Sequence, residues 1–331
     1  MRLILPMGGR GTRLRPFSHT TPKPLLPLVG RPAIARLLDA FAGALGRAVE
    51  EVVFVLGPTA DANLRRRLTE ACAAEGLGAS FALQPEPLGT AHAIACAGDA
   101  LDGEVLTCWG DTLFTPSADV PLDGFDLLAW TVEVEDPRRF GVVVRDDGGR
   151  ITGLIEKPPD ATHRETLIGA YYVRDGRDLR AVVDEMIATG ATGAGGEFQL
   201  TDAYDRLVQR GARMATAPAA RWLDTGTLAS YRETVRALLE TGEHAPTAAE
   251  VAVVAPSFIH SDATVRRSVV GPHAVVEAGA VVEDSVLRAT VVMAGATVRD
   301  AELTDSLVGE RATVEGLTGT FTLGDDAIAH G

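Results

Sequence analysis

Residues 2–13 read RLILPMGGRGTR, and this stretch decides the fold of the first part of the chain. Residues 2–5 have the pattern of a short buried strand, which ends at Pro6 just before glycines at 8, 9 and 11. Glycines that follow a strand let backbone N–H groups approach an anion, because no Cβ stands in the way. The stretch therefore predicts a strand and a phosphate-binding loop in an α/β fold.

The alternation of strand and helix patterns continues after this loop. Apolar strand patterns occur at 52–56, 79–83 and 105–109, and helical patterns occur at 33–45, 61–75 and 90–97. Such alternation predicts a mixed, mainly parallel Rossmann-like sheet that is wrapped by helices. In sheets of this kind ligands bind beyond the carboxyl ends of the strands, where the glycine loop and Asp111 both fall.

The second half of this region is richer in strand patterns, which should extend the sheet. They occur at 127–134, 142–145, 151–155 and 168–173, and helical patterns return at 179–187, 200–210 and 227–239. A stretch rich in Thr, Ala and Pro then has the composition of a linker. We therefore expect a catalytic domain over 1–240, a linker over 241–255 and a second domain over 256–331.

The second domain carries a short repeat. The pattern Ala-x-Val recurs five times, at 263–265, 274–276, 280–282, 296–298 and 312–314. Spacings of six, or sums of fives and sixes, are typical of a left-handed parallel β-helix in which each side turns a corner at a small residue. An antiparallel β sandwich is the alternative.

Composition excludes several classes of protein. The net charge of −14 argues against a nucleic-acid surface, and no apolar run approaches the roughly 18 to 20 residues of a membrane span. The three cysteines have no metal-ligand spacing, so we expect reduced thiols and a cytoplasmic protein. Residues 1–38 contain no acidic residue but seven basic ones, and this local positive charge indicates a site for small anions.

Lysine usage points to two particular cations. Of the 31 basic residues only Lys23 and Lys157 are lysines, and the other 29 are arginines. A compact ammonium fits between phosphate oxygens where a guanidinium fork does not, which favours a phosphate-binding role for both. Lys23 lies in the segment TPKPLLP at 21–27, and Lys157 lies in IEKP at 155–158. One alternative is that the two lysines are present by chance. Another is that Glu156 and Lys157 form a solvated pair on the surface.

Two further motifs follow apolar strand patterns. The loop QPEPLGTA at 84–91 contains Gln84, whose amide can pair with the carbonyl and N–H groups of thymine or uracil. Asp111 in WGD at 109–111 and Asp224 in WLDTGT at 222–227 each end an apolar segment. The alternatives are a Pro-rich turn for the loop, a turn or helix cap for Asp111, and an N-cap for Asp224.

Together these motifs resemble the signature of the nucleotide-sugar pyrophosphorylases, the sugar-1-phosphate nucleotidyltransferase family. The segment GGRGTRLRP at 8–16 with TPKPLLP carries most of the resemblance, and Pro6-Met7 stands where the family usually has Leu-Ala. The resemblance covers 1–240 closely, and 256–320 resemble the solenoid tails of longer members. Within the family, the long-form glucose-1-phosphate thymidylyltransferases are the nearest resemblance.

The resemblance implies a role for each motif. Nucleotide-binding roles fall on Gly8, Gly9, Gly11, Thr12, Arg13, Gln84, Gly89 and Asp111. Roles in binding the sugar phosphate fall on Gly141, Glu156, Lys157, Gly169 and Glu197. Catalytic roles fall on Arg13, Lys23 and Lys157, and a Mg²⁺ ion is assigned to Asp111 and Asp224. The stretch GGEFQLTD at 195–202 places Glu197 near the sugar or in support of its loop.

The expected reaction joins a nucleoside triphosphate, dTTP before others, to a hexose-1-phosphate, glucose-1-phosphate before others, and releases pyrophosphate. A mannose-1-phosphate guanylyltransferase or a UTP-dependent uridylyltransferase is the alternative enzyme, and a catalytically silent regulatory subunit that binds nucleotide sugars is the alternative of another class. The tails of relatives build subunit contacts, so a homo-oligomer is expected. His260 and His273 lie in the solenoid, where some relatives use a histidine for acetyl transfer, but both are expected to be surface residues.

Overall fold

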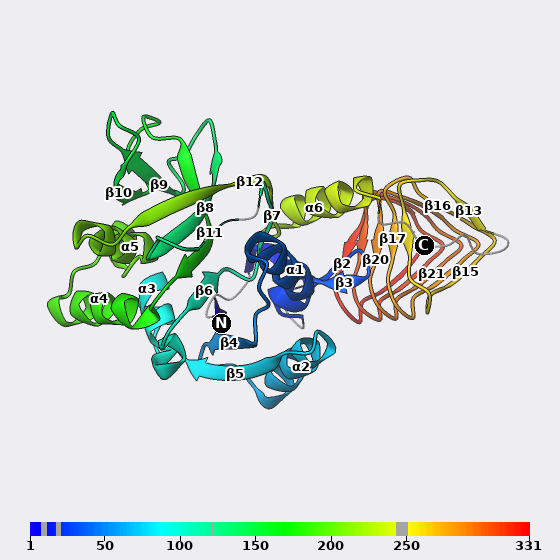
Figure 1. The fold of residues 1–331 in the computed structure, drawn as a ribbon. Helices are drawn as coiled ribbons and strands as arrows, with labels where there is room; N and C mark the ends of the chain where they lie inside the picture. The colour runs from blue at the N-terminus through cyan, green and yellow to red at the C-terminus, as the bar shows by residue number, and fades with distance from the viewer. Residues whose placement is uncertain (8–11, 18–20, 119, 121, 243–250) are drawn as a thin grey trace. The chain divides into compact units, whose positions relative to one another are not determined.

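The computed structural model describes residues 1–7, 12–17, 21–118, 120, 122–242 and 251–331 (Figure 1). The chain forms two compact units. Unit 1 consists of Met1–Gly9 and Ile34–Trp222, and unit 2 consists of Arg10–Ala33 and Leu223–Gly331. No helix in these described ranges is long and apolar enough to cross a membrane.

Unit 1 is built on one mixed sheet, as the alternation of patterns predicted. Its main path runs β5-β4-β1-β6-β11-β8-β12-β7, and β9 and β10 form a hairpin attached to β11. The first four strands of the path are parallel, β11 is antiparallel to both of its neighbours, and β12 is parallel to β8. The strands are β1 (Arg2–Pro6), β4 (Glu51–Leu56), β5 (Gly78–Leu83), β6 (Val105–Cys108), β7 (Thr112–Pro116), β8 (Leu127–Glu133), β9 (Gly141–Arg145), β10 (Ile151–Glu156), β11 (Glu165–Val173) and β12 (Met214–Asp224).

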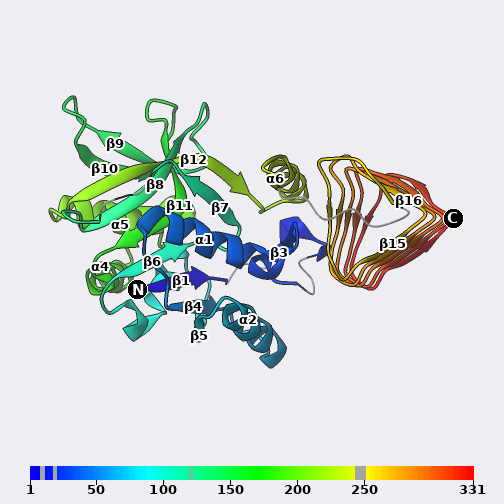
Figure 2. The same cartoon turned by 45° about the vertical axis from the view of Figure 1, so that its right-hand side comes forward.

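Helices bury both faces of this sheet (Figure 2). On one face α3 (Thr90–Ala95), α4 (Gly176–Thr189) and α5 (Leu200–Gln209) share a hydrophobic core with the central strands. On the other face Phe41 of α1 (Ala33–Leu45) packs against Phe114 and Trp130, with ring centroids 5.3 and 5.4 Å apart. The helix α2 (Ala62–Ala74) packs beside β5, and its N-cap Asp61 accepts a hydrogen bond from the backbone N–H of Leu64.

Unit 2 contains a parallel β-helix, which confirms the expectation from the Ala-x-Val repeat. Its strands form three five-stranded sheets in which every pairing is parallel, so the antiparallel sandwich is wrong. Ile259, Val276, Val292, Val308 and Leu323 are in register, so successive coils are 17, 16, 16 and 15 residues long. The alanines and valines of the repeat fill the interior. The helix α6 (Leu228–Glu240) belongs to the same unit.

The strands of the β-helix run from residue 251 to 330. The three sheets are β13 (Val251–Val253), β16 (Ser268–Val270), β19 (Val286–Arg288), β22 (Glu302–Thr304) and β25 (Thr318–Gly319); β14 (Phe258–Ile259), β17 (Val275–Val276), β20 (Val291–Val292), β23 (Leu307–Val308) and β26 (Thr322–Leu323); and β15 (Thr264–Arg266), β18 (Val281–Glu283), β21 (Thr297–Arg299), β24 (Thr313–Glu315) and β27 (Ile328–His330). The first strand, β13, therefore lies inside the stretch whose composition is that of a linker.

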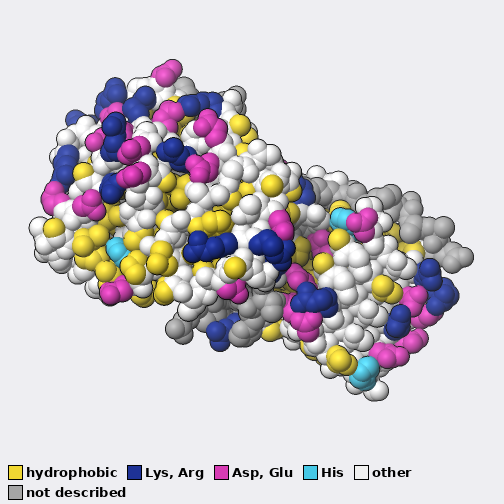
Figure 3. Space-filling model, turned by 90° about the horizontal axis from the view of Figure 1, so that it is seen from below, with side chains coloured by type: hydrophobic (Ala, Val, Ile, Leu, Met, Phe, Trp, Pro, Cys, Tyr) yellow, Lys and Arg dark blue, Asp and Glu magenta, His cyan; other side chains and the backbone are white. Residues whose placement is uncertain are grey.

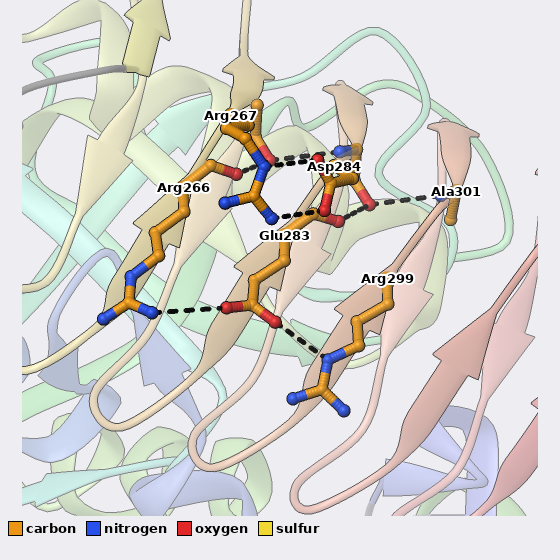
Figure 4. Close-up of polar contacts among 8 residues, drawn as sticks. Arg266, Arg267, Glu283, Asp284, Arg299 and Ala301 are labelled. Atoms are coloured by element: carbon orange, nitrogen blue, oxygen red, sulfur yellow. Dashed lines mark hydrogen bonds and ion pairs between the residues drawn. The ribbon is translucent and has the colours of Figure 1, made fainter.

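Charged side chains on the β-helix alternate in sign from coil to coil. Arg266, Glu283 and Arg299 occupy the same register position on consecutive strands (Figure 4). The Glu283 carboxylate lies 3.7 Å from the Arg266 guanidinium and 3.0 Å from that of Arg299. Basic and acidic side chains accordingly lie next to one another on the surface of the β-helix (Figure 3). Each exposed ion pair adds little stability by itself. The alternating charges of Arg266, Glu283 and Arg299 are nevertheless compatible with the observed stacking of coils, since no like charges lie next to each other.

Candidate active site

Three of the predicted segments leave the sheet of unit 1 at the same edge. The strands β1, β5 and β6 belong to the parallel part of the sheet, so their carboxyl ends share one edge. Met7 follows β1, Gln84 follows β5 directly, and Asp111 follows β6 after a two-residue step. This edge is where doubly wound sheets place their ligands.

Gln84 is held in a defined orientation at this edge. The residue is 6% exposed, and its backbone N–H donates to the carbonyl of Leu56 at 2.8 Å. The Nε2 group donates to the carbonyl of Gly89 and lies near Nδ1 of His92, both at 3.2 Å. The Pro-rich loop is therefore not a turn with Gln84 in solvent, since the amide is buried and closes the loop on itself.

Gly89 closes the other end of this loop in a backbone conformation that favours glycine. Its φ is +126°, and a Cβ at this position would lie 2.5 Å from the carbonyl oxygen of Phe198. The backbone of Phe198 also exchanges hydrogen bonds with the loop, since its N–H donates to Leu88 and its carbonyl accepts from Ala91, both at 2.9 Å. Glycine at 89 is thus required both by its dihedral angle and by this close approach.

We expect the substitution Gly89→Ala to destabilise unit 1 by about 2 kcal/mol or more, because it adds a clash to an unfavourable dihedral angle. Gly98→Ala is the matched control, since Gly98 also has a positive φ, +59°, but nothing lies within 4 Å of its Cβ position. Thermal denaturation of both variants measures the difference. Equal losses in melting temperature would contradict the close packing of Gly89.

The start of α5 connects the Gln84 loop with the β9–β10 hairpin. The backbone N–H of Leu200 donates to the hydroxyl of Thr90, near the end of the Gln84 loop, at 2.9 Å. One residue later, the Thr201 hydroxyl donates to the Glu156 carboxylate at the end of β10 at 2.7 Å. Two segments that are far apart in the sequence are therefore fixed to one helix terminus.

Glu156, Lys157 and Gly141 lie together at the open end of the hairpin. Glu156 pairs with Gly141 across the two strands, and a Cβ on Gly141 would lie 2.7 Å from the Thr201 hydroxyl. Lys157 donates its backbone N–H to Phe140 at 2.9 Å, and its ammonium is 3.9 Å from the Glu156 carboxylate. The Lys157 side chain is 49% exposed, so its charge is accessible to a ligand.

Two acidic residues flank this group. Burial raises the pKa of the Asp202 carboxyl, and the negative charges of Glu156 and Asp205 raise it further. Glu197 is exposed, and its carboxylate accepts a hydrogen bond from Nε2 of Gln199 at 3.3 Å. The carboxyl oxygens of Glu156, Glu197 and Asp202 are hydrogen-bond acceptors. Such acceptors suit the hydroxyl groups of a sugar, which donate hydrogen bonds to carboxylates.

Trp109 lies two residues before Asp111 in the sequence, and its ring lies against Gly169. Gly169 has a φ of +82° where β11 breaks its register with β8, and a Cβ there would lie 2.3 Å from the Trp109 ring. Trp109 precedes the turn that carries Asp111 between β6 and β7. Burial raises the pKa of the neighbouring Cys108 thiol, and the negative charge of Asp111 raises it further. Cys72 and Cys96 are likewise free, as expected.

Unit 2 carries Arg13, Lys23 and Asp224. Arg13 is exposed in the short 3-10 helix η1 (Thr12–Leu14), and Lys23 begins the 3-10 helix η3 (Lys23–Leu25). Asp224 is the last residue of β12 and accepts the backbone N–H of Gly226 at 2.8 Å. It is not a helix cap, because Thr227 caps α6 together with Ser230 in a capping box.

The segment around Lys23 packs on the β-helix of its own unit. The Thr21 hydroxyl donates to the Glu310 carboxylate at 3.0 Å, and the Gly30 N–H donates to the buried Glu277 carboxylate at 3.0 Å. The Tyr231 hydroxyl of α6 donates to the carbonyl of Pro27 at 2.6 Å. These contacts fix both sides of the short hairpin formed by β2 (Pro27–Leu28) and β3 (Arg31–Pro32).

Some predicted residues lie outside the described part of the chain, and some contacts were not predicted. Gly8, Gly9 and Gly11 lie outside the described residues, as does the side chain of Thr12. Sequence reasoning did not assign roles to Thr90, His92, Trp109 or Thr201. The positions of Thr90, Trp109 and Thr201 inside the recognised motifs were the only signal for them, whereas nothing in the sequence singled out His92.

The chain therefore combines a mixed α/β sheet in unit 1 with a parallel β-helix in unit 2. Residues 2–241 match the family model described as nucleotidyl transferase. A glucose-1-phosphate thymidylyltransferase of Streptomyces griseus is 31% identical over 73% of this chain and 67% of its own length, and one of Streptomyces antibioticus is 32% identical over 72% and 67%. The bifunctional protein GlmU of Halorhodospira halophila is 35% identical over 61% of this chain but 41% of its own length.

The chain belongs to the nucleotidyl transferase family and is a sugar-1-phosphate nucleotidyltransferase. A solved structure of UDP-glucose pyrophosphorylase complexed with UDP-glucose matches with a TM-score of 0.58 at 24% identity, covering 72% of this chain and 98% of that chain. At this identity the likeness concerns the fold, and it confirms the predicted α/β architecture.

Proposed function

We propose that this chain catalyses transfer of a nucleotidyl group from dTTP or UTP to glucose-1-phosphate, with release of pyrophosphate. The observation that carries the proposal is the Gln84 loop, which holds an amide and a glycine backbone at the ligand-binding edge of the sheet. The similarity to two glucose-1-phosphate thymidylyltransferases over two thirds of their length supports the same reaction. A guanylyltransferase is the second candidate.

In the proposed reaction the base lies against Gln84 and Gly89, and the triphosphate lies on the loop at 8–13. Arg13 and Lys23 neutralise the charge of the phosphates. Lys157 holds the phosphate of the sugar, while Glu156 accepts hydrogen bonds from sugar hydroxyls. Nucleotidyl transfer needs positioning and charge stabilisation rather than a covalent nucleophile. The sugar phosphate oxygen attacks the α-phosphorus in line with the departing pyrophosphate.

The proposal assigns a magnesium ion to two aspartates. The described residues contain no cluster of three or more His, Cys, Asp or Glu side chains that would form a closed metal cage. Mg²⁺ binds through one or two carboxylates and leaves its other positions to phosphate and water. Asp111 and Asp224 would hold the ion. It would neutralise the charge that develops on the phosphate oxygens.

The experiment that tests the proposal is a panel of nucleoside triphosphates against hexose-1-phosphates, with release of pyrophosphate as the readout. We expect turnover with glucose-1-phosphate and with dTTP or UTP, and loss of turnover when EDTA removes the divalent cation. Preference for GTP with mannose-1-phosphate would favour the second candidate. Binding of nucleotide sugar without turnover of any pair would contradict the proposal and indicate a regulatory subunit.

A further inference from the structure

The hydrogen bonds around Gln84 fix which face of its amide is available to a ligand. A carbonyl oxygen only accepts hydrogen bonds, so the amide atom that lies 3.2 Å from the Gly89 carbonyl is the Nε2 group. The same Nε2 group lies 3.2 Å from Nδ1 of His92. An amide nitrogen has two N–H groups and no acceptor capacity, so Nδ1 of His92 accepts the second one.

The two contacts of the His92 ring fix which of its nitrogens carries the proton. Because Nδ1 accepts a hydrogen bond, the proton of the neutral ring lies on Nε2. The Nε2 atom is 3.6 Å from Sγ of Cys96, one turn further along the chain, so it donates to the sulfur. Burial raises the pKa of Cys96, which keeps the thiol neutral. One directed series of hydrogen bonds therefore includes Gly89, Gln84, His92 and Cys96.

Both N–H groups of the Gln84 amide are used by the protein, and only its oxygen is left for a ligand. Among the described residues, no hydrogen bond reaches Oε1 of Gln84, and none is donated by the backbone N–H of Gly89. The loop thus presents one acceptor and one donor. Uracil, thymine and guanine present an N–H beside a carbonyl, whereas cytosine and adenine present a ring nitrogen acceptor beside an amino group.

We propose that His92 is a positioning residue that locks the Gln84 amide and thereby makes the site select bases with an N–H beside a carbonyl over cytosine and adenine. The inference rests on the proposed function, because it assumes that the base lies at this loop. It gives a physical reason for excluding cytosine and adenine, and the lock itself does not distinguish uracil, thymine and guanine. His92 acts only through Gln84.

UTP and CTP form the sharpest pair of probes, because their bases differ only in this pattern. The substitution His92→Leu removes the acceptor for one N–H group, while His92→Asn puts an amide oxygen near the position of Nδ1. We expect His92→Leu to lower the preference for UTP over CTP about tenfold, the effect of one lost hydrogen bond. The loss should appear in the KM for nucleotide rather than in the KM for the sugar phosphate, and His92→Asn should restore most of the preference.

Equilibrium binding of UTP and CTP to the full chain gives the same comparison without turnover. An unchanged ratio of dissociation constants in a folded His92→Leu variant would overturn the inference, as would a His92→Asn variant that behaves like His92→Leu. If the wild-type chain preferred UTP over CTP in binding but released no pyrophosphate, the proposed reaction alone would fail. Melting temperatures of both variants separate an effect on the base site from loss of the fold.

Discussion

The substitution Asp111→Asn is expected to lower kcat by about two to three orders of magnitude, because it removes a negative charge at the end of β6 where the proposal places Mg²⁺. Asn has nearly the shape of Asp, so the turn between β6 and β7 should be retained. The neighbouring contacts of that turn, from the Thr112 N–H to Trp109 at 3.1 Å and from the Thr112 hydroxyl to Ile168 at 3.3 Å, do not involve the carboxylate. Steady-state pyrophosphate release at saturating substrates measures the loss.

Asp147→Asn provides the matched control for this experiment. Asp147 is an exposed aspartate in the turn between β9 and β10, so the same chemical change there should leave kcat within about twofold. Titration with Mg²⁺ adds a second readout, since Asp111→Asn should need a higher concentration of the ion for half of its residual activity. Near-normal kcat with an unchanged magnesium dependence would remove Asp111 from the proposed metal site.

The substitution Lys157→Met is expected to lower kcat/KM for the hexose-1-phosphate by about two to three orders of magnitude, because in the proposed reaction the ammonium stabilises the attacking phosphate. Lys157 follows β10 with a φ of +50° and is anchored by its backbone N–H rather than by its side chain. Its side chain is half exposed, and its closest ionic contact is the 3.9 Å approach to Glu156. The fold should therefore tolerate methionine, whose side chain has a similar length.

The variant Lys157→Arg separates the effect of the positive charge from the effect of side-chain shape. A guanidinium keeps the charge but cannot occupy the place of a compact ammonium, so we expect only partial recovery relative to Lys157→Met. The KM for the nucleoside triphosphate should stay close to the wild-type value in both variants. A change confined to the nucleotide KM would contradict the assignment of Lys157 to the sugar phosphate.

Local patterns predicted most of the elements but not all of the sheet. The helix over 33–45 and the strand over 79–83 have clear periodicity, and the structure places them at Ala33–Leu45 and Gly78–Leu83. The strands β7 and β12 were not predicted. The sequence MATAPAARWLD of β12 is rich in alanine and contains Pro218, and it becomes a strand through its parallel pairing with β8, about 90 residues earlier in the chain.

Motifs indicate which residues form the candidate site, but they do not indicate how the side chains are oriented. Gln84 and Gly89 were assigned from the resemblance to the family, and the residue type suggested that the amide pairs with a base through both its oxygen and its nitrogen. The structure adds that this nitrogen, Nε2, already has partners within the protein, Gly89 and His92. A sequence does not specify tautomers or amide orientations, because these depend on atoms that only the tertiary structure brings together.

The contacts of Thr21 and Gly30 with Glu310 and Glu277 bear on how chimaeras of this family should be built. Exchanging the C-terminal tail alone would place foreign side chains against the stretch that carries Lys23 and would leave the partly buried N–H of Gly30 without its acceptor. The stretch at 21–30 and the β-helix residues Glu277 and Glu310 therefore depend on each other. A functional graft has to transfer both, even though about 250 residues separate them in the chain.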